Sequence, residues 1–144
     1  MNGTNSIHLV SCVSIKSEHP CSAGLLYRSP WFEKARAYVL AQGGPWYILS
    51  AEHGLVHPDT VIEPYERTLN TMGIHDRRAW AERVKDQVRR QGLSPERFVI
   101  LAGQRYREFL LDFLNGRSES VVVPMEGLGI GQQLRWLTQS MRNG

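Results

Sequence analysis

Four short apolar runs alternate with amphipathic helical patterns along this chain, and that alternation limits its fold more than any other feature. The runs cover residues 7–10, 46–49, 98–101 and 121–123. Continuous apolar strands separated by helices are typical of a parallel sheet that is covered on both faces. We therefore predict an α/β fold: a single-domain three-layer sandwich with a mostly parallel sheet of about four strands flanked by helices.

The helices are predicted at residues 30–42, 76–91, 106–114 and 130–141. Ser29-Pro30 is a typical start, with serine at the N-cap and proline at the first helical position. Asp76 is a suitable N-cap for the second helix. The third helix has the fullest apolar stripe along one face.

Length and composition fit one domain that covers residues 1–144. No apolar run approaches the roughly 20 residues of a membrane span, and the first residues do not resemble a signal peptide. We therefore expect a cytoplasmic protein with no membrane partner. The chain has two cysteines, and its sequence contains no metal-binding spacing and no dinucleotide or phosphate-loop motif. We therefore expect no metal ion and no other cofactor.

The net charge of +3 permits a nucleic-acid partner without arguing strongly for one. Arginines are frequent between residues 77 and 107, but acidic residues are interleaved with them. Such a mixture is as typical of a solvated helix face as of a surface that contacts phosphates.

Residues suited to chemistry follow the end of each predicted strand. Ligands of open α/β sheets bind in the crevice beyond the carboxyl ends of the strands, so these clusters predict one pocket. The connections at 13–28 and 52–75 leave the same edge and are long enough to form its walls.

The exit from the second strand supplies the candidate catalytic residues. Glu52 and His53 are placed for proton transfer, although adjacent side chains at a strand end point in opposite directions. Glu66 provides a carboxylate of the kind that glycosidic-bond chemistry needs, and Tyr65 is suited to stack on a base. Whether Glu52 or Glu66 reacts stays open, as does a purely structural role for this loop.

The remaining candidates would bind the substrate. Hydroxyl groups and a lysine after the first strand are suited to a phosphate, and glycines before the last helix allow an anion to approach the backbone. Tight packing of the helix on the sheet would require similar glycines, so both interpretations stay open. The predicted binding residues are Ser11, Cys12, Lys16, Ser50, Gly54, Gly103, Tyr106, Gly127, Gly129 and Gln132.

Five segments resemble motifs of the YaaA-like family, in the same order along the chain. They are Ser11-Cys12, residues 49–55, Pro64-Tyr65-Glu66, residues 101–106 and residues 124–137. After Cys12 the sequence departs from the Gly-Lys that is usual in that family. The resemblance implies an α/β fold and a link to DNA, through protection against oxidative damage, base modification or phage defence.

Three functions are compatible with these residues. The first is a nucleobase-processing enzyme, a DNA glycosylase-like hydrolase of the N-glycosidic bond of a damaged or modified base. The second is a non-catalytic DNA-binding module of a stress or phage-defence system. The third is an N-glycosidase of free nucleotides or nucleosides. The expected partner is thus a nucleic acid, with DNA preferred to RNA, or a nucleotide, and the oligomeric state stays open.

Overall fold

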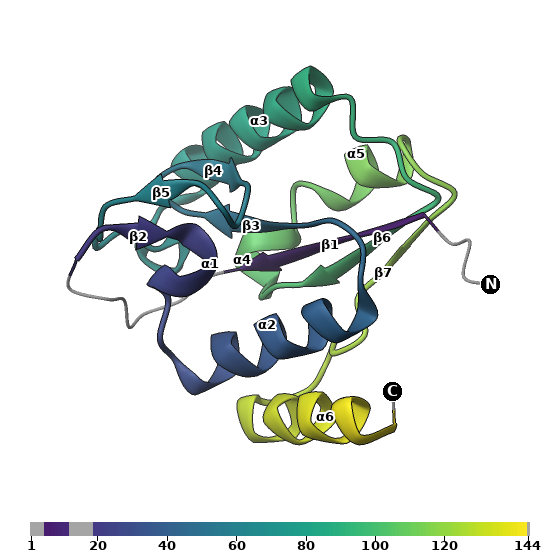
Figure 1. Ribbon diagram of the computed structural model, residues 1–144. Coiled ribbons are helices and arrows are strands. Elements are labelled where there is room, and N and C mark those ends of the chain that lie inside the picture. Colours follow the sequence, from purple (N-terminus) through teal and green to yellow (C-terminus); the bar gives the residue numbers. More distant parts are fainter. Residues whose placement is uncertain (1–4, 12–18, 144) are drawn as a thin grey trace.

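The computed structural model describes residues 5–11 and 19–143 and confirms the predicted α/β sandwich. A five-stranded sheet with the order β4-β3-β1-β6-β7 lies at its centre (Figure 1). The strands are β1 (Ser6–Ser11), β3 (Trp46–Ser50), β4 (Gly54–Val56), β6 (Arg97–Leu101) and β7 (Ser120–Val122). The four parallel strands are those predicted from the apolar runs, and β4 runs antiparallel to β3.

The long connections contain short elements that the sequence pattern did not predict. A second, two-stranded sheet pairs β2 (Cys21–Ser22) antiparallel with β5 (Val61–Ile62). The helix α1 (Ala23–Leu26) follows β2, and the 3-10 helix η1 (Leu69–Thr71) follows β5. These elements are too short to produce a recognisable periodicity. They join the two long connections to each other through the β2–β5 pairing.

Two long helices end or begin close to their predicted positions. The helix α2 (Pro30–Gln42) begins as predicted, and the Ser29 hydroxyl oxygen accepts a hydrogen bond from the Phe32 N–H at 3.1 Å. The helix α3 (Ile74–Gln91) ends at the left-handed Gly92. Its predicted N-cap at Asp76 is wrong, because Asp76 lies in the first turn of the helix, where a negative charge also favours the helix dipole.

The predicted single helix over residues 106–114 is also wrong. The chain forms α4 (Gln104–Arg107) and α5 (Leu111–Asn115), which are separated by a turn. In that turn the Leu110 N–H donates to the carbonyl of Arg107, three residues back, at 2.9 Å. The apolar residues whose spacing suggested one helix are nevertheless buried: Tyr106, Leu110 and Leu114.

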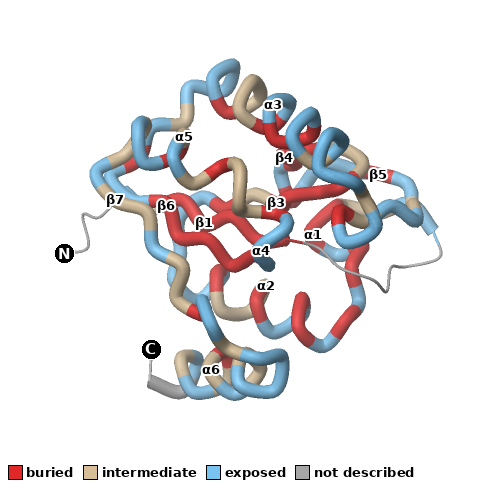
Figure 2. The backbone as a smooth tube through the Cα atoms, turned by 180° about the vertical axis from the view of Figure 1, so that it is seen from behind, coloured by how far each residue is buried: buried red, intermediate tan, exposed pale blue. Residues whose placement is uncertain are grey.

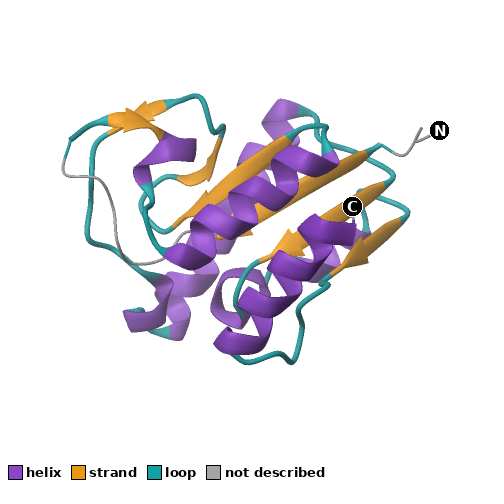
Figure 3. Cartoon of the chain, turned by 60° about the horizontal axis from the view of Figure 1, so that its bottom comes forward, coloured by secondary structure: helices purple, strands orange, loops and turns teal. Residues whose placement is uncertain are grey.

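Helices cover both faces of the sheet. On one face α2 and α6 (Ile130–Asn143) lie side by side, and on the other lie α3, α4 and α5 (Figure 3). Successive strand residues point to opposite faces, so Val10 packs with α2 while Leu9 packs with α3. Figure 2 shows the buried residues along the strands, between the two layers of helices. None of the helices in the described part of the chain is long and apolar enough to cross a membrane.

The strand order reverses at β1. The chain passes from β1 to β3 on one side and later places β6 on the other side of β1. Such a reversal leaves a crevice beyond the carboxyl ends of the two central strands, because the connections leave in opposite directions. In this fold the crevice lies beyond the ends of β1 and β6.

Candidate functional site

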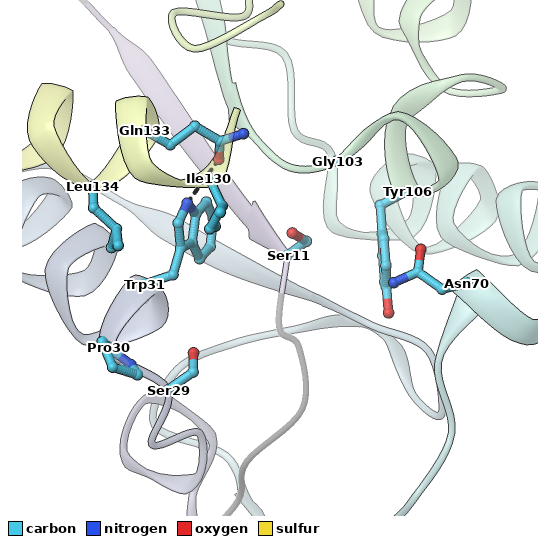
Figure 4. A pocket seen from close by; sticks show the side chains of 10 residues that line it. All are labelled: Ser11, Ser29, Pro30, Trp31, Asn70, Gly103, Tyr106, Ile130, Gln133 and Leu134. Atoms are coloured by element: carbon cyan, nitrogen blue, oxygen red, sulfur yellow. Dashed lines mark hydrogen bonds between the residues drawn. The ribbon is translucent and has the colours of Figure 1, made fainter. Parts of the chain in front are cut away.

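A cavity of about 410 Å³ lies beyond the carboxyl ends of β1 and β6. Ser11 ends β1, Gly103 follows β6, and both line the cavity (Figure 4). The starts of α2 and α6 contribute the opposite side. The cavity brings together three of the predicted binding residues, Ser11, Gly103 and Tyr106, and their role in binding stays a prediction.

Two aromatic side chains form opposite walls of this cavity. Trp31 comes from the first turn of α2 and Tyr106 from α4, and Figure 4 shows them on either side of Ser11. The Trp31 Nε1–H donates to Oε1 of Gln133 at 2.8 Å, and Nε2 of Gln133 donates to the carbonyl of Leu128 at 2.8 Å. These bonds fix the indole and orient the amide of Gln133, which also lines the cavity.

Tyr106 is held in place by contacts with the segment that carries the 3-10 helix η1 and with α3. Its hydroxyl oxygen accepts from the Leu69 N–H at 3.3 Å and lies 3.3 Å from the hydroxyl of Thr68. The Trp80 ring meets the Tyr106 ring edge to face, with centroids 5.7 Å apart. Asn70, the next residue after Leu69, lines the cavity beside Tyr106. The segment that carries η1 is therefore part of the site.

A chain of three hydroxyl groups lies at the end of β3. The Tyr65 hydroxyl is 2.7 Å from both the Ser50 hydroxyl and the Tyr27 hydroxyl. The Ser50 oxygen also accepts from the His53 N–H at 3.0 Å, and the His53 and Tyr65 rings meet at 89°. Ser50 and Tyr65 thus contact each other, and their polar groups bond to the protein. Their role in a site stays a prediction. Tyr27 belongs to this cluster and was not among the predicted residues.

Neither candidate carboxylate lines the cavity. The side chain of Glu52 is 41% exposed and lies 3.5 Å from Arg67, and its backbone carbonyl accepts from Arg83 at 2.8 Å. Glu66 is exposed, on the segment between Tyr65 and Thr68. Both ends of that segment are hydrogen-bonded, Tyr65 to Ser50 and Thr68 to Tyr106.

Gly54 has a structural role in the turn between β3 and β4. Its φ is +74°, and a Cβ at this position would collide with the side-chain amide of Gln87. Gln87 accepts from the Leu55 N–H at 2.7 Å and donates to the His53 carbonyl at 3.0 Å. The glycine therefore allows one side chain of α3 to bond to both sides of the turn.

Replacing Gly54 by alanine is expected to lower the free energy of unfolding by more than about 1–2 kcal/mol, the usual cost of a left-handed backbone for an L-residue. The collision with Gln87 adds to that cost. Urea denaturation measures the change, with Gly131→Ala as the control, because Gly131 is helical and a Cβ there meets nothing within 4 Å. Equal stabilities of Gly54→Ala and the parent would contradict the structural role.

The exit from β7 borders a smaller cavity of about 180 Å³, which shares Gly103 and Gln133 with the larger one. Gly127 lines it with a φ of +84°. The Gly129 N–H donates to Oε1 of Gln132 at 3.0 Å, so Gln132 caps the start of α6. The helical register directs Gln133, its neighbour, toward the larger cavity.

Several lining residues were not predicted as site residues, and two predicted ones are not described. From the sequence, Trp31 was assigned to the core and Ser29 only to a helix start. Helices of a parallel α/β unit begin at the edge of the sheet where ligands bind, so the position of both residues at the start of a helix was the available signal. Cys12 and Lys16 lie outside the described residues. Within the described ranges, no three side chains of His, Cys, Asp or Glu are grouped so as to hold a metal ion.

The fold and the cavity define the chain as an α/β protein with a cavity at the switch point of a mostly parallel sheet. Residues 7–139 match the model of the family of unknown function DUF6884, and the chain belongs to that family. A relative, "Uncharacterized protein YfjM" of Bacillus subtilis (strain 168), is 30% identical over 125 residues, which cover 85% of this chain and 81% of YfjM. No solved structure matches the chain.

The resemblance to the YaaA-like family is therefore wrong. The family model and the YfjM relative cover most of the chain, and neither links it to YaaA. The motifs that suggested the resemblance are short and contain residue types that are common at strand ends of α/β folds. The link to DNA that the resemblance implied loses its basis.

Proposed function

We propose that the protein is a nucleobase-processing enzyme that hydrolyses the N-glycosidic bond of a free nucleoside or nucleotide. The observation that carries the proposal is the pair of aromatic walls, Trp31 and Tyr106, across a cavity of about 410 Å³. Cavities that hold small ligands have volumes of roughly 300–1,000 Å³. Stacking of a base on an aromatic side chain contributes about 1–3 kcal/mol. A cavity with an aromatic ring on each side suits a base better than a sugar or an aliphatic acid.

Two amide side chains that line the cavity suit the edge of a base. The amides of Asn70 and Gln133 each offer donors and an acceptor, and Figure 4 shows them on opposite sides of the cavity. The amide of Gln133 is already oriented by Trp31 and Leu128, so its remaining donor and lone pair have fixed directions. A fixed amide selects among bases, because a mismatched edge leaves a buried polar group unpaired.

In the proposed reaction, the oxygen of a water molecule bonds to C1′ of the sugar while the bond from C1′ to the base nitrogen breaks. The electron pair of that bond goes to the base nitrogen, which takes up a proton, and the water gives up one. The products are the free base and the sugar with a hydroxyl at C1′. A carboxylate assists by accepting the proton of the water or by stabilising the cationic sugar.

Glu66 is the preferred carboxylate for this step. Among the described residues it has no ion-pair partner, whereas the carboxylate of Glu52 lies 3.5 Å from Arg67. The segment that contains Glu66 also contributes Asn70 to the cavity. Tyr65 joins this segment to the end of β3 through Ser50, and its ring contacts that of His53. In the proposal Glu66 reacts from this segment while the cavity holds the base.

A DNA glycosylase that acts on a damaged or modified base and a non-catalytic DNA-binding module are the alternative proposals. Both need basic side chains that are free to contact phosphates. Several arginines instead bond within the protein: Arg77 to Glu108, Arg83 to the Glu52 carbonyl, Arg107 to the Ala102 carbonyl and Arg117 to the Leu93 carbonyl. This engagement supports a free nucleotide over a polymer as the substrate, and we propose the cytoplasm as its location.

The test is a search for free base by mass spectrometry. The protein is incubated with normal and modified nucleosides, their 5′-monophosphates and DNA oligonucleotides that contain the same bases. We expect a base to be released from monomers faster than from oligonucleotides. Release from oligonucleotides alone would favour the DNA glycosylase, and the absence of release from every compound would overturn the enzymatic proposal.

A further inference from the structure

We infer that the cavity contains a subsite for an anionic group, and that the substrate is a nucleotide with a phosphate rather than an uncharged nucleoside. The choice of a nucleotide rests on the proposed function, whereas the anion subsite follows from the geometry alone. The starts of two helices and the side chains of two buried serines line the cavity.

Both α2 and α6 begin at the cavity. They have 13 and 14 residues, and their first residues, Pro30 and Ile130, both line it. The N–H groups in the first turn of a helix have no partner within the helix, and the helix dipole places partial positive charge there. In α2, among the described residues, only the Trp31 N–H remains available, because Pro30 has no N–H and the Phe32 N–H donates to Ser29. In α6 the N–H groups of Ile130, Gly131 and Gln132 have no partner within the described part of the chain. Such groups favour the binding of a phosphate or a carboxylate.

The Ser11 side chain gives independent evidence for a ligand. Ser11 is only 3% exposed, and its hydroxyl points into the cavity (Figure 4). Among the described residues this hydroxyl has no hydrogen-bond partner. The hydroxyl faces the cavity and bonds to no other described residue, so its proton is free for a ligand. A ligand oxygen in the cavity would accept its proton.

Ser29 adds a second donor at the start of α2. It is 7% exposed, and its oxygen accepts from the Phe32 N–H at 3.1 Å. The hydroxyl proton is not used in that bond, and Figure 4 shows the side chain directed into the cavity. The N-cap serine therefore both closes the helix and offers a donor to an anion.

The remaining lining is compatible with a negative charge. No acidic side chain of the described residues lines the cavity. Figure 4 shows the helix starts on one side of Ser11 and the Tyr106 and Asn70 side chains on the other. A base that stacks on Tyr106 would therefore direct its phosphate toward the helix starts.

Calorimetric titration with defined probes tests the subsite: the common nucleosides, their 5′-monophosphates, ribose 5-phosphate, inorganic phosphate and a short single-stranded oligonucleotide. We expect at least one monophosphate to bind about tenfold more tightly than its nucleoside, which corresponds to about 1.4 kcal/mol. Gly131→Asp, compared with the neutral Gly131→Asn, is expected to remove most of that difference. A Cβ at Gly131 meets nothing within 4 Å, and an acid at a helix start favours the helix, so the loss would not come from unfolding. Ser11→Ala should reduce the same difference in part.

The outcomes separate the subsite from the proposed function. Equal affinities for nucleosides and monophosphates, or equal affinities of Gly131→Asp and Gly131→Asn for the monophosphate, would overturn the subsite and leave the base-binding proposal intact. Binding of ribose 5-phosphate as tight as that of every nucleotide would support the subsite and contradict the stacked base. Tight binding of the oligonucleotide, also weakened by Gly131→Asp, would support the subsite and identify a polymer as the source of the phosphate.

Discussion

Replacement of Glu66 by glutamine is expected to slow the release of free base by about 10²- to 10⁴-fold, the usual contribution of a positioned acid or base group. The amide has nearly the shape of the carboxylate, but it neither accepts a proton from water nor stabilises a cationic sugar. Glu66 is exposed and makes no ion pair within the described residues, so the fold should be unaffected. The measurement is the initial rate of base release from the substrate that the mass-spectrometric search identifies, together with the substrate affinity.

Glu63→Gln is the matched control. Glu63 is also exposed and lies on the same loop, separated from Glu66 by Pro64 and Tyr65. It should retain the rate of the parent, which shows that the removal of charge from this loop is not itself harmful. Glu52→Gln should have an intermediate effect at most, because its carboxylate is paired with Arg67. If Glu66→Gln releases base as fast as the parent, Glu66 is not the reacting carboxylate.

The sheet was predictable because its central strands are buried on both faces. Residues 7–10 and 98–101 are apolar without interruption, as expected when α2 and α6 cover one face and α3 the other. The break between α4 and α5 was not predictable, because the stripe formed by Tyr106, Leu110 and Leu114 keeps helical spacing across the turn. β4 was missed because it is short and its turn depends on Gln87, a residue 33 positions after Gly54.

The site was only partly predictable, for a related reason. Residues at the ends of strands could be found from the sequence, since each strand end was visible, and Ser11, Gly103 and Tyr106 do line the cavity. Trp31 was assigned to the core because its apolar ring contributes to the core as well as to the wall. Asn70 follows Leu69, whose N–H bonds to the hydroxyl of Tyr106, a residue far away in the sequence. The local sequence around Asn70 cannot predict such a contact.

Trp31→Leu is expected to weaken the binding of a nucleoside 5′-monophosphate by about 5- to 150-fold, which corresponds to the 1–3 kcal/mol of stacking on a base. Leucine retains apolar bulk in the core but has no flat face. Trp31→Phe retains an aromatic ring but loses the bond from Nε1–H to Gln133, so it should bind more tightly than Trp31→Leu. Both variants lose buried volume, and thermal unfolding of each must be measured to show that they remain folded at the temperature of the titration. Equal affinities of Trp31→Leu and Trp31→Phe, with both folded, would mean that the indole serves only the core. In that case Tyr106 would be the one aromatic side chain of the cavity on which a base could stack.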